Sequence, residues 1–247
     1  MRLCPPFRIL RMIEDATVAE SEPNNDAARL AKIGAHVAAR LNANPRVQRL
    51  DHADAQVYGH KGFLSLEECK GLIDLIDAAA VPSTLFAGTE QAGFRTSSSC
   101  HLNCWDPLVG RVEARMSEVL GIDNGYAETM QGQRYFVGQE FKAHHDFFHP
   151  GQEYWEREKL AGGQRTWTAM IFLNQPEAGG NTEFPELGIG VRPQAGMMLI
   201  WNNVKPDGSL NHKTLHTGTQ VTAGVKHIIT KWYRQNNWRE INTPKAS

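Results

Sequence analysis

The sequence predicts a mainly β protein with flanking helices, an α+β arrangement. Two observations lead to this fold class. Between residues 26 and 120, apolar side chains recur at the spacing of amphipathic helices. After residue 125, short segments rich in Val, Ile, Thr and aromatic residues alternate with clusters of Gly, Pro and Asn, which is typical of strands and turns. Because many short strands follow the helices, we expect a double-stranded β-helix, or jelly roll, with the helices packed on the outside of one sheet.

Three helices are predicted, over residues 26–41, 65–80 and 107–120. The first is rich in alanine and carries larger apolar residues at helical spacing. The second begins with a capping box, in which Ser65 accepts a bond from an early backbone N–H and Glu68 reaches back. The third begins at a proline and ends before a glycine, as helices commonly do. The residues before the first helix are expected to form a flexible arm.

Eight strands are predicted in the second half of the chain. They cover residues 128–137, 139–144, 166–174, 182–184, 189–192, 196–202, 214–221 and 225–234. Along the last of them, every second residue from Lys226 to Arg234 shares one face, and the residues between, from His227 to Tyr233, take the other.

Charge and hydropathy exclude two classes of partner. The chain has 26 basic and 27 acidic residues, a net charge of −1, which argues against binding nucleic acid through bulk charge. No run approaches the roughly 20 apolar residues of a membrane-spanning helix, and arginines and prolines interrupt the N-terminal apolar run, unlike a secretory signal. We therefore expect a cytoplasmic protein with no nucleic-acid or membrane partner, and we expect its four cysteines to be reduced thiols.

The strongest chemical signal is a pair of metal-ligand residues at the end of a predicted strand. His144 and Asp146 stand two apart, so their side chains face the same side of the chain and can bind one ion together. A second histidine would complete the two-histidine, one-carboxylate triad that holds one face of ferrous iron. His216, at the start of another predicted strand, is the candidate.

Lys226 follows His216 by ten residues, at the start of the last strand. If the two strands are adjacent and antiparallel, the imidazole and the ammonium group lie at opposite ends of one pocket. The lysine can then pair with the far carboxylate of a small diacid that chelates the metal. An alternative triad stays open, because His145, His149 and His212 crowd the same region, whereas His52-x-Asp54 is interpreted as a solvated surface pair.

Six ordered segments of the chain resemble a known family. They read RYFVGQEFKAHHDFF, GGQRTWTAMIFLN, GGNTEFP, VRPQAGMMLIW, DGSLNHKTLHTG and AGVKHIITKWYR. In this order and spacing they are similar to the catalytic domain of prolyl 4-hydroxylases, within the Fe(II)- and 2-oxoglutarate-dependent oxygenases. The resemblance covers about residues 58–238. It divides the chain into an N-terminal arm and supporting helix over 1–57, the dioxygenase domain over 58–238 and a tail over 239–247.

The resemblance implies a role for individual residues. The iron ligands, and so the catalytic residues, would be His144, Asp146 and His216. The distal carboxylate of 2-oxoglutarate would bind Lys226, assisted by Tyr135 and Thr168. The substrate side would include Arg165, Trp232 and Arg95. The sequence departs from the family pattern at two positions on that side, where Phe141 replaces a tyrosine and Arg234 replaces a histidine.

The activity that the resemblance implies is hydroxylation of an unactivated C–H bond, most simply C4 of a proline in a peptide or protein, with release of succinate and CO2. Its cofactors and co-substrates would be Fe(II), 2-oxoglutarate and O2, with ascorbate as a reductant. The polar segment 149–164 would close over the peptide, and a homodimer stays open. One alternative is an oxygenase acting on a free amino acid or another small molecule. Two others are a metal-dependent hydrolase and a non-catalytic jelly-roll binding domain.

Overall fold

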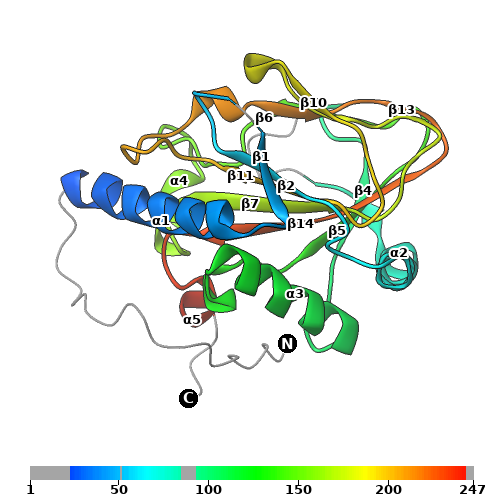
Figure 1. Ribbon diagram of the computed structural model, residues 1–247, viewed down its shortest axis with the longest axis horizontal. Coiled ribbons are helices and arrows are strands. Elements are labelled where there is room, and N and C mark those ends of the chain that lie inside the picture. The colour runs from blue at the N-terminus through cyan, green and yellow to red at the C-terminus, as the bar shows by residue number, and fades with distance from the viewer. Residues whose placement is uncertain (1–22, 51, 85–92, 243–247) are drawn as a thin grey trace.

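Two antiparallel sheets face each other in the computed structural model, which describes residues 23–50, 52–84 and 93–242 (Figure 1). The large sheet has the strand order β1 (Val47–Leu50), β2 (Val57–His60), β11 (Met198–Asn202), β7 (Arg165–Phe172), β14 (Lys226–Arg234), β5 (Gln131–Tyr135), β4 (Ser98–His101) and β3 (Val81–Pro82). The small sheet has the order β10 (Ile189–Val191), β9 (Thr182–Phe184), β12 (His216–Gly218) and β6 (Phe141–His144). A separate pair joins β8 (Ala178–Gly179) to β13 (Val221–Ala223).

Helices cover the outer face of the large sheet. The helices are α1 (Pro23–Ala43), α2 (Leu66–Ala79), α3 (Pro107–Leu120), α4 (Trp155–Leu160) and α5 (Trp238–Asn242), with 3-10 turns η1 (Asn124–Tyr126), η2 (Pro185–Leu187) and η3 (His212–Thr214). Figure 1 shows α1 and α3 on the same side of the large sheet. Val37 of α1, Ile76 of α2 and Val112 of α3 are fully buried and form one core with Trp167 and Ile229 of the sheet. The predicted position of the helices outside one sheet is confirmed.

The ends of two helices follow from local hydrogen bonds. The Ser65 hydroxyl accepts from the Glu68 N–H at 3.1 Å, and the Glu68 carboxylate accepts from the Ser65 N–H at 2.9 Å, so the predicted capping box is present. At the end of α3, Gly121 adopts φ 70°, a left-handed conformation that glycine enters without strain. The first helix begins three residues before its predicted start, at Pro23.

A second core fills the space between the two sheets. Phe172, Leu199 and Ile228 of the large sheet meet Phe184 of the small sheet there. Ile228 and Ile229 therefore point to different cores, as the period-two pattern of the last strand predicts. The functional residues described below lie in this inter-sheet space, at one end of the second core.

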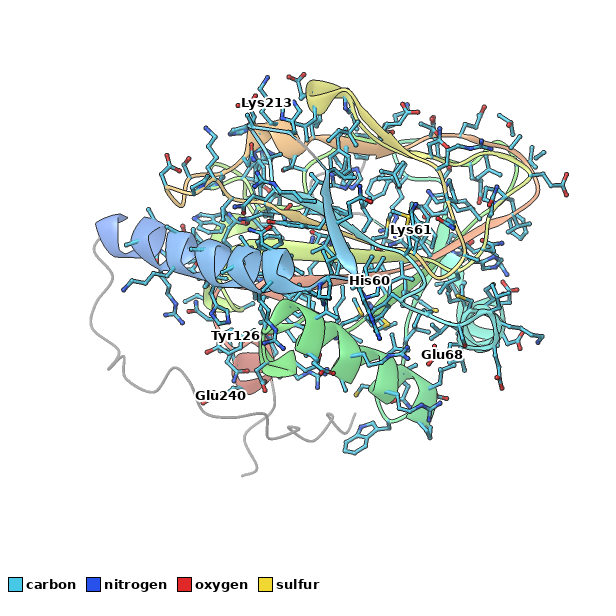
Figure 2. All side chains as sticks on the ribbon, in the orientation of Figure 1. His60, Lys61, Glu68, Tyr126, Lys213 and Glu240 are labelled. Atoms are coloured by element: carbon cyan, nitrogen blue, oxygen red, sulfur yellow. The ribbon has the colours of Figure 1, made fainter. Side chains whose placement is uncertain are left out.

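The strand predictions are correct in the second half of the chain and incomplete in the first. Strands β1, β2, β3 and β4 lie in the part that was predicted as helical, and they are only two to four residues long. The predicted strand 214–221 divides into β12, in the small sheet, and the start of β13, in the separate pair. Turn η3 carries Lys213 on the small-sheet side of the molecule, while α5 with Glu240 and η1 with Tyr126 lie on the opposite side (Figure 2).

Two further expectations can be compared with the structure. Cys69 and Cys100 are free thiols, whereas Cys104 is disulfide-bonded, so the expectation of reduced cysteines holds for the first two and is wrong for the third. Within the described ranges, none of the helices combines the length and the apolar character needed to cross a bilayer.

Candidate active site

The two candidate histidine ligands lie opposite each other on neighbouring strands. Strands β6 and β12 are antiparallel, and His144 is the direct partner of His216. Asp146 follows the end of β6 by two residues, and its carboxylate oxygens lie 3.9 Å from His144 Nε2 and 3.7 Å from His216 Nε2. One ligand atom from each of the three residues lies within 4.8 Å of the others, and this is the only such group among the described residues.

Backbone carbonyls fix the tautomer of both imidazoles. The Nδ1 atom of His144 lies 2.8 Å from the carbonyl oxygen of Lys142, and the Nδ1 atom of His216 lies 3.0 Å from that of Thr214. A carbonyl oxygen only accepts, so each Nδ1 must carry the hydrogen. Each Nε2 then keeps a bare lone pair, directed toward Asp146, as a metal ligand requires.

The protonation states of the triad fit a divalent metal. Burial, together with the neighbouring His216, lowers the pKa of His144 to about 3, so this imidazole is neutral at neutral pH. Burial also acts to raise the pKa of Asp146, but the imidazoles, Arg165 and the Thr168 hydroxyl outweigh it and hold this pKa below its ordinary value. Two imidazoles and one carboxylate form the donor set of non-haem Fe(II) oxygenases.

Lys226 lies in the same cavity, on the facing sheet. Strand β14 places it opposite Tyr135 of β5, and its side chain lines the cavity together with the triad. Its Nζ lies 5.4 Å from the ring centroid of Tyr135 and 5.6 Å from that of Phe172. Within the described part of the chain it has no hydrogen bond or ion pair. Burial lowers the pKa of Lys226 to about 7, which shows how unfavourable its charge is without a counter-charge.

The predicted common pocket of His216 and Lys226 is present, but the predicted arrangement of their two strands is wrong. His216 and Lys226 are not on adjacent strands, because β12 belongs to the small sheet and β14 to the large one. The seven residues between β12 and β14 include β13, which leaves the small sheet and lets the chain cross to the facing sheet. The two side chains therefore face each other across the inter-sheet space.

Tyr135 and Thr168, both predicted to assist Lys226, take different places. The Tyr135 hydroxyl donates to Gln133 Oε1 at 2.7 Å, and burial raises the pKa of this tyrosine. The Thr168 hydroxyl instead donates to Asp146 Oδ2 at 2.7 Å, so the structure places Thr168 on the metal-ligand side of the cavity. Strand pairing sets Thr168 opposite Trp232, which is six residues from Lys226 on β14.

Arg165, predicted to lie on the substrate side, is held by other protein groups. Its Nε and Nη2 atoms donate to the two carboxylate oxygens of Glu128, each at 2.7 Å. The guanidinium lies 4.2 Å from the ring centroid of Trp232 and 4.8 Å from that of Phe148, and its Nη1 lies 3.5 Å from the Asp146 carbonyl oxygen. Arg165 therefore supports the backbone of a ligand residue and one wall of the cavity, which Trp232 lines directly.

The second departure from the family pattern, Arg234, belongs to the same network. Its Nη1 donates to Glu128 Oε1 at 2.9 Å and to Glu158 Oε2 at 3.1 Å, while its Nε and Nη2 bind the carbonyl oxygens of Gly163 and Glu158. The segment 149–164, predicted as a polar loop, contains α4 and is fastened to the large sheet by these bonds.

Phe141 and Arg95 form the opposite wall. The Phe141 ring stacks on the His144 imidazole, with centroids 3.6 Å apart and an angle of 17° between the planes. Arg95 lies 5.0 Å above the Phe141 ring and is fixed by hydrogen bonds to Ser97 Oγ at 3.1 Å and Gln131 Oε1 at 2.9 Å. With phenylalanine in place of tyrosine, this wall offers an apolar face.

The alternative histidines are not brought together as ligands. The rings of His145, His149 and His212 surround Phe147, with centroids 4.5, 4.9 and 5.2 Å from it.

Four residues in or beside the site were not identified from the sequence: Glu128, Gln133, Trp201 and Asn203. The only signal for Asn203 was its place in the Asn202-Asn203 pair that ends an apolar run, and nothing local identified Glu128 as the partner of two distant arginines.

Comparison with known proteins agrees with this geometry. Residues 130–234 match the family described as the 2OG-Fe(II) oxygenase superfamily. The chain is 31% identical over 204 residues to prolyl 4-hydroxylase 5 of Arabidopsis thaliana, covering 73% of this chain and 68% of that protein. It is 31% identical over 167 residues to prolyl 4-hydroxylase subunit alpha-1 of Mus musculus, covering 67% of this chain and 31% of that subunit. The chain thus spans about a third of the animal subunit.

Solved structures share the fold. A viral collagen prolyl hydroxylase from Paramecium Bursaria Chlorella virus-1, solved with 2OG, superposes with a TM-score of 0.57 at 24% identity, covering 78% of this chain and 98% of that one. A prolyl-4-hydroxylase of Pseudomonas putida gives 0.54 at 17% identity, covering 80% and 98%. These superpositions confirm the jelly-roll fold, and the Arabidopsis relative shows the family. The chain belongs to the prolyl 4-hydroxylases of the 2OG-Fe(II) oxygenase superfamily, whose members use Fe(II), 2-oxoglutarate and O2.

Proposed function

We propose that this chain is a 2-oxoglutarate-dependent dioxygenase that hydroxylates C4 of a proline residue in a peptide or protein, with release of succinate and CO2. The observation that carries the proposal is the convergence of His144, Asp146 and His216 in a cavity that Lys226 also lines. The names of the relatives, which are prolyl 4-hydroxylases, support proline as the target.

Each part of the site has a role in this reaction. His144, Asp146 and His216 would hold Fe(II) on one face, and the bound metal supplies the oxidative chemistry with O2 and 2-oxoglutarate. Lys226 would bind the distal carboxylate of 2-oxoglutarate, because a buried ammonium group without a partner strongly favours an anionic ligand. Trp232 and Phe141 would orient the substrate, since both line the cavity beside the triad.

The Arg165 contacts favour a peptide over a free amino acid. A free amino acid presents a carboxylate, and its usual partner is an arginine that can donate two parallel hydrogen bonds. Arg165 already donates such a pair to Glu128, which is itself shared with Arg234. A peptidyl proline has no carboxylate at this point and needs no such partner.

Two measurements test the proposal in sequence. Anaerobic addition of Fe(II) and 2-oxoglutarate should give the visible charge-transfer band of the chelate, and the band should disappear in His216→Ala. Folded wild-type protein without the band would refute the cofactor assignment and favour the non-catalytic binding domain. Proline-containing peptides and free amino acids are then compared for succinate release and the gain of one oxygen atom. Turnover of free amino acids alone would favour the small-molecule alternative.

We extend the proposal to the setting of the enzyme. Its partner would be a proline-containing peptide or protein, with no nucleic acid or membrane involved, and ascorbate would act as reductant. We also propose a cytoplasmic location and a homodimer. Sedimentation of the purified chain tests the homodimer, and stimulation of repeated turnovers by ascorbate tests the reductant.

A further inference from the structure

A buried chain of hydrogen bonds leads away from Asp146 to an asparagine on the neighbouring strand. The Thr168 hydroxyl donates to Asp146 Oδ2 at 2.7 Å, and Asn203 Nδ2 donates to Thr168 Oγ1 at 2.9 Å. Thr168 and Asn203 are both 0% exposed and Asp146 is 6% exposed, so water does not compete for these bonds. Thr168 lies in β7 and Asn203 directly follows β11, which pairs with β7.

The hydrogens in this chain can take only one arrangement. A carboxylate that binds a metal carries no proton, so the Asp146 oxygens only accept. The single hydroxyl hydrogen of Thr168 must therefore point to Asp146, which leaves the Thr168 oxygen as an acceptor. Asn203 must then present its NH2 group, because its carbonyl oxygen in the same place would compete with Asp146 for that one hydrogen.

An asparagine at position 203 is a costly choice if the stability of the fold alone is considered. Its Oδ1 is buried and has no hydrogen-bond partner in the part of the chain that the structure describes. A buried acceptor without a partner costs free energy, and an apolar side chain of similar size avoids that cost. Among the described residues, Thr168 is the only hydrogen-bond partner of the Asn203 side chain.

We propose that Asn203 is a positioning residue for the metal centre, which acts through Thr168 on the Asp146 carboxylate. The two hydrogen bonds, from Asn203 to Thr168 and from Thr168 to Asp146, form a relay. This relay holds Oδ2 in a hydrogen bond and keeps the carboxylate from rotating. Oδ2 then stays 3.7 Å from His216 Nε2, and Oδ1, which accepts no hydrogen bond from any described residue, stays 3.9 Å from His144 Nε2. Outer groups that orient a ligating carboxylate raise metal affinity in this way. The inference rests on the metal-binding part of the proposed function and assigns Thr168 to the metal.

Five variants test the relay, one of them the conservative replacement Thr168→Ser, with Co(II) as the metal probe. Asn203→Leu removes the amide donor, Thr168→Val removes the hydroxyl in a side chain of the same shape, and the double variant removes both. Asn202→Leu is the matched control, because Asn202 is equally buried but its amide donates to Gln56 at 2.8 Å, away from the triad. Calorimetry gives the Co(II) dissociation constant, and visible absorption of Co(II) reports the ligand geometry.

We expect Asn203→Leu and Thr168→Val each to weaken Co(II) binding by about 10- to 100-fold, the range measured for outer-shell changes elsewhere. The double variant should bind no more weakly than Thr168→Val, because Asn203 acts only through that hydroxyl. Thr168→Ser should restore affinity, and the urea midpoint of Asn203→Leu should not fall below that of wild type.

Three results would overturn the inference. The first is an Asn203→Leu variant that binds Co(II) within twofold of the wild type. The second is a further loss of affinity when Asn203→Leu is added to Thr168→Val, which means an independent effect. The third is an equal loss in Asn202→Leu, which means a general effect of loosening β11. Wild-type protein that binds no Co(II) would refute the proposed metal function itself, so the two failures are distinguishable.

Discussion

Replacement of Lys226 by methionine should weaken 2-oxoglutarate binding by at least about 30-fold and stabilise the protein without ligand. Methionine keeps the apolar stem that packs near Tyr135 and Phe172 and removes the ammonium group. Burial lowers the pKa of Lys226 from 10.5 to about 7, and each pKa unit corresponds to about 1.36 kcal/mol. The folded state therefore carries roughly 4 to 5 kcal/mol of unfavourable free energy at pH 7, which the variant loses. Urea denaturation should show this gain.

The binding loss follows from the same burial. Removing one partner of a buried, hydrogen-bonded charge pair costs about 2–5 kcal/mol, or roughly 30-fold to several thousand-fold in the dissociation constant. Calorimetric titration of the anaerobic metal complex with 2-oxoglutarate measures this loss. Lys231, on the opposite face of the same strand, is the control: it pairs with Glu113 at 2.6 Å, so Lys231→Met should destabilise the protein. If Lys226→Met binds 2-oxoglutarate with less than threefold loss of affinity, the role of Lys226 as the carboxylate partner is refuted.

Five other predictions follow from named contacts. His216→Ala should lose metal binding by at least tenfold in calorimetry, since one of three ligands is gone. The affinity for 2-oxoglutarate should fall up to tenfold per pH unit above pH 7, because Lys226 must then take up a proton on binding. Below pH 7 the affinity should not change with pH. In the protein without ligand, the free energy of unfolding should rise between pH 7 and 10.5, because over this range only the unfolded chain keeps the ammonium proton of Lys226. Lys226→Met should lack this rise in urea titrations. Arg234→Met should destabilise the protein by about 3–5 kcal/mol and speed hydrogen exchange in α4, because it leaves Glu158 without that partner. Ser65→Ala should cost about 1 kcal/mol in urea denaturation, and an unchanged midpoint would contradict the capping role.

The sequence predictions that proved correct depend on local patterns. The capping box at Ser65 and the period-two alternation along β14 depend only on neighbouring residues, and both are present in the structure. The spacing of His144 and Asp146 likewise fixes their common direction. These features could be predicted because a strand or helix repeats a short geometry regardless of the rest of the chain.

Predictions that depended on tertiary pairing failed or were missing. Strands β1 and β2 could not be predicted from four residues each, since β2 is buried throughout and shows no alternation. Thr168 is 22 residues from Asp146 in the sequence, and its bond to Asp146 arises only because the two sheets face each other. The same holds for Glu128, which binds arginines 37 and 106 residues away.

The direct pairing of His144 with His216 also bears on the lifetime of the folded chain. The small sheet consists of strands of only three or four residues, and the pairing of β6 with β12 is irregular. A metal held by both histidines would tie together two segments 72 positions apart (216 − 144). A ligand that binds only the folded state adds about 2.7 kcal/mol at a concentration 100 times its dissociation constant. Scarcity of iron would then shorten the survival of the protein against proteolysis as well as its activity, so that the amount of enzyme in the cell follows the supply of its metal.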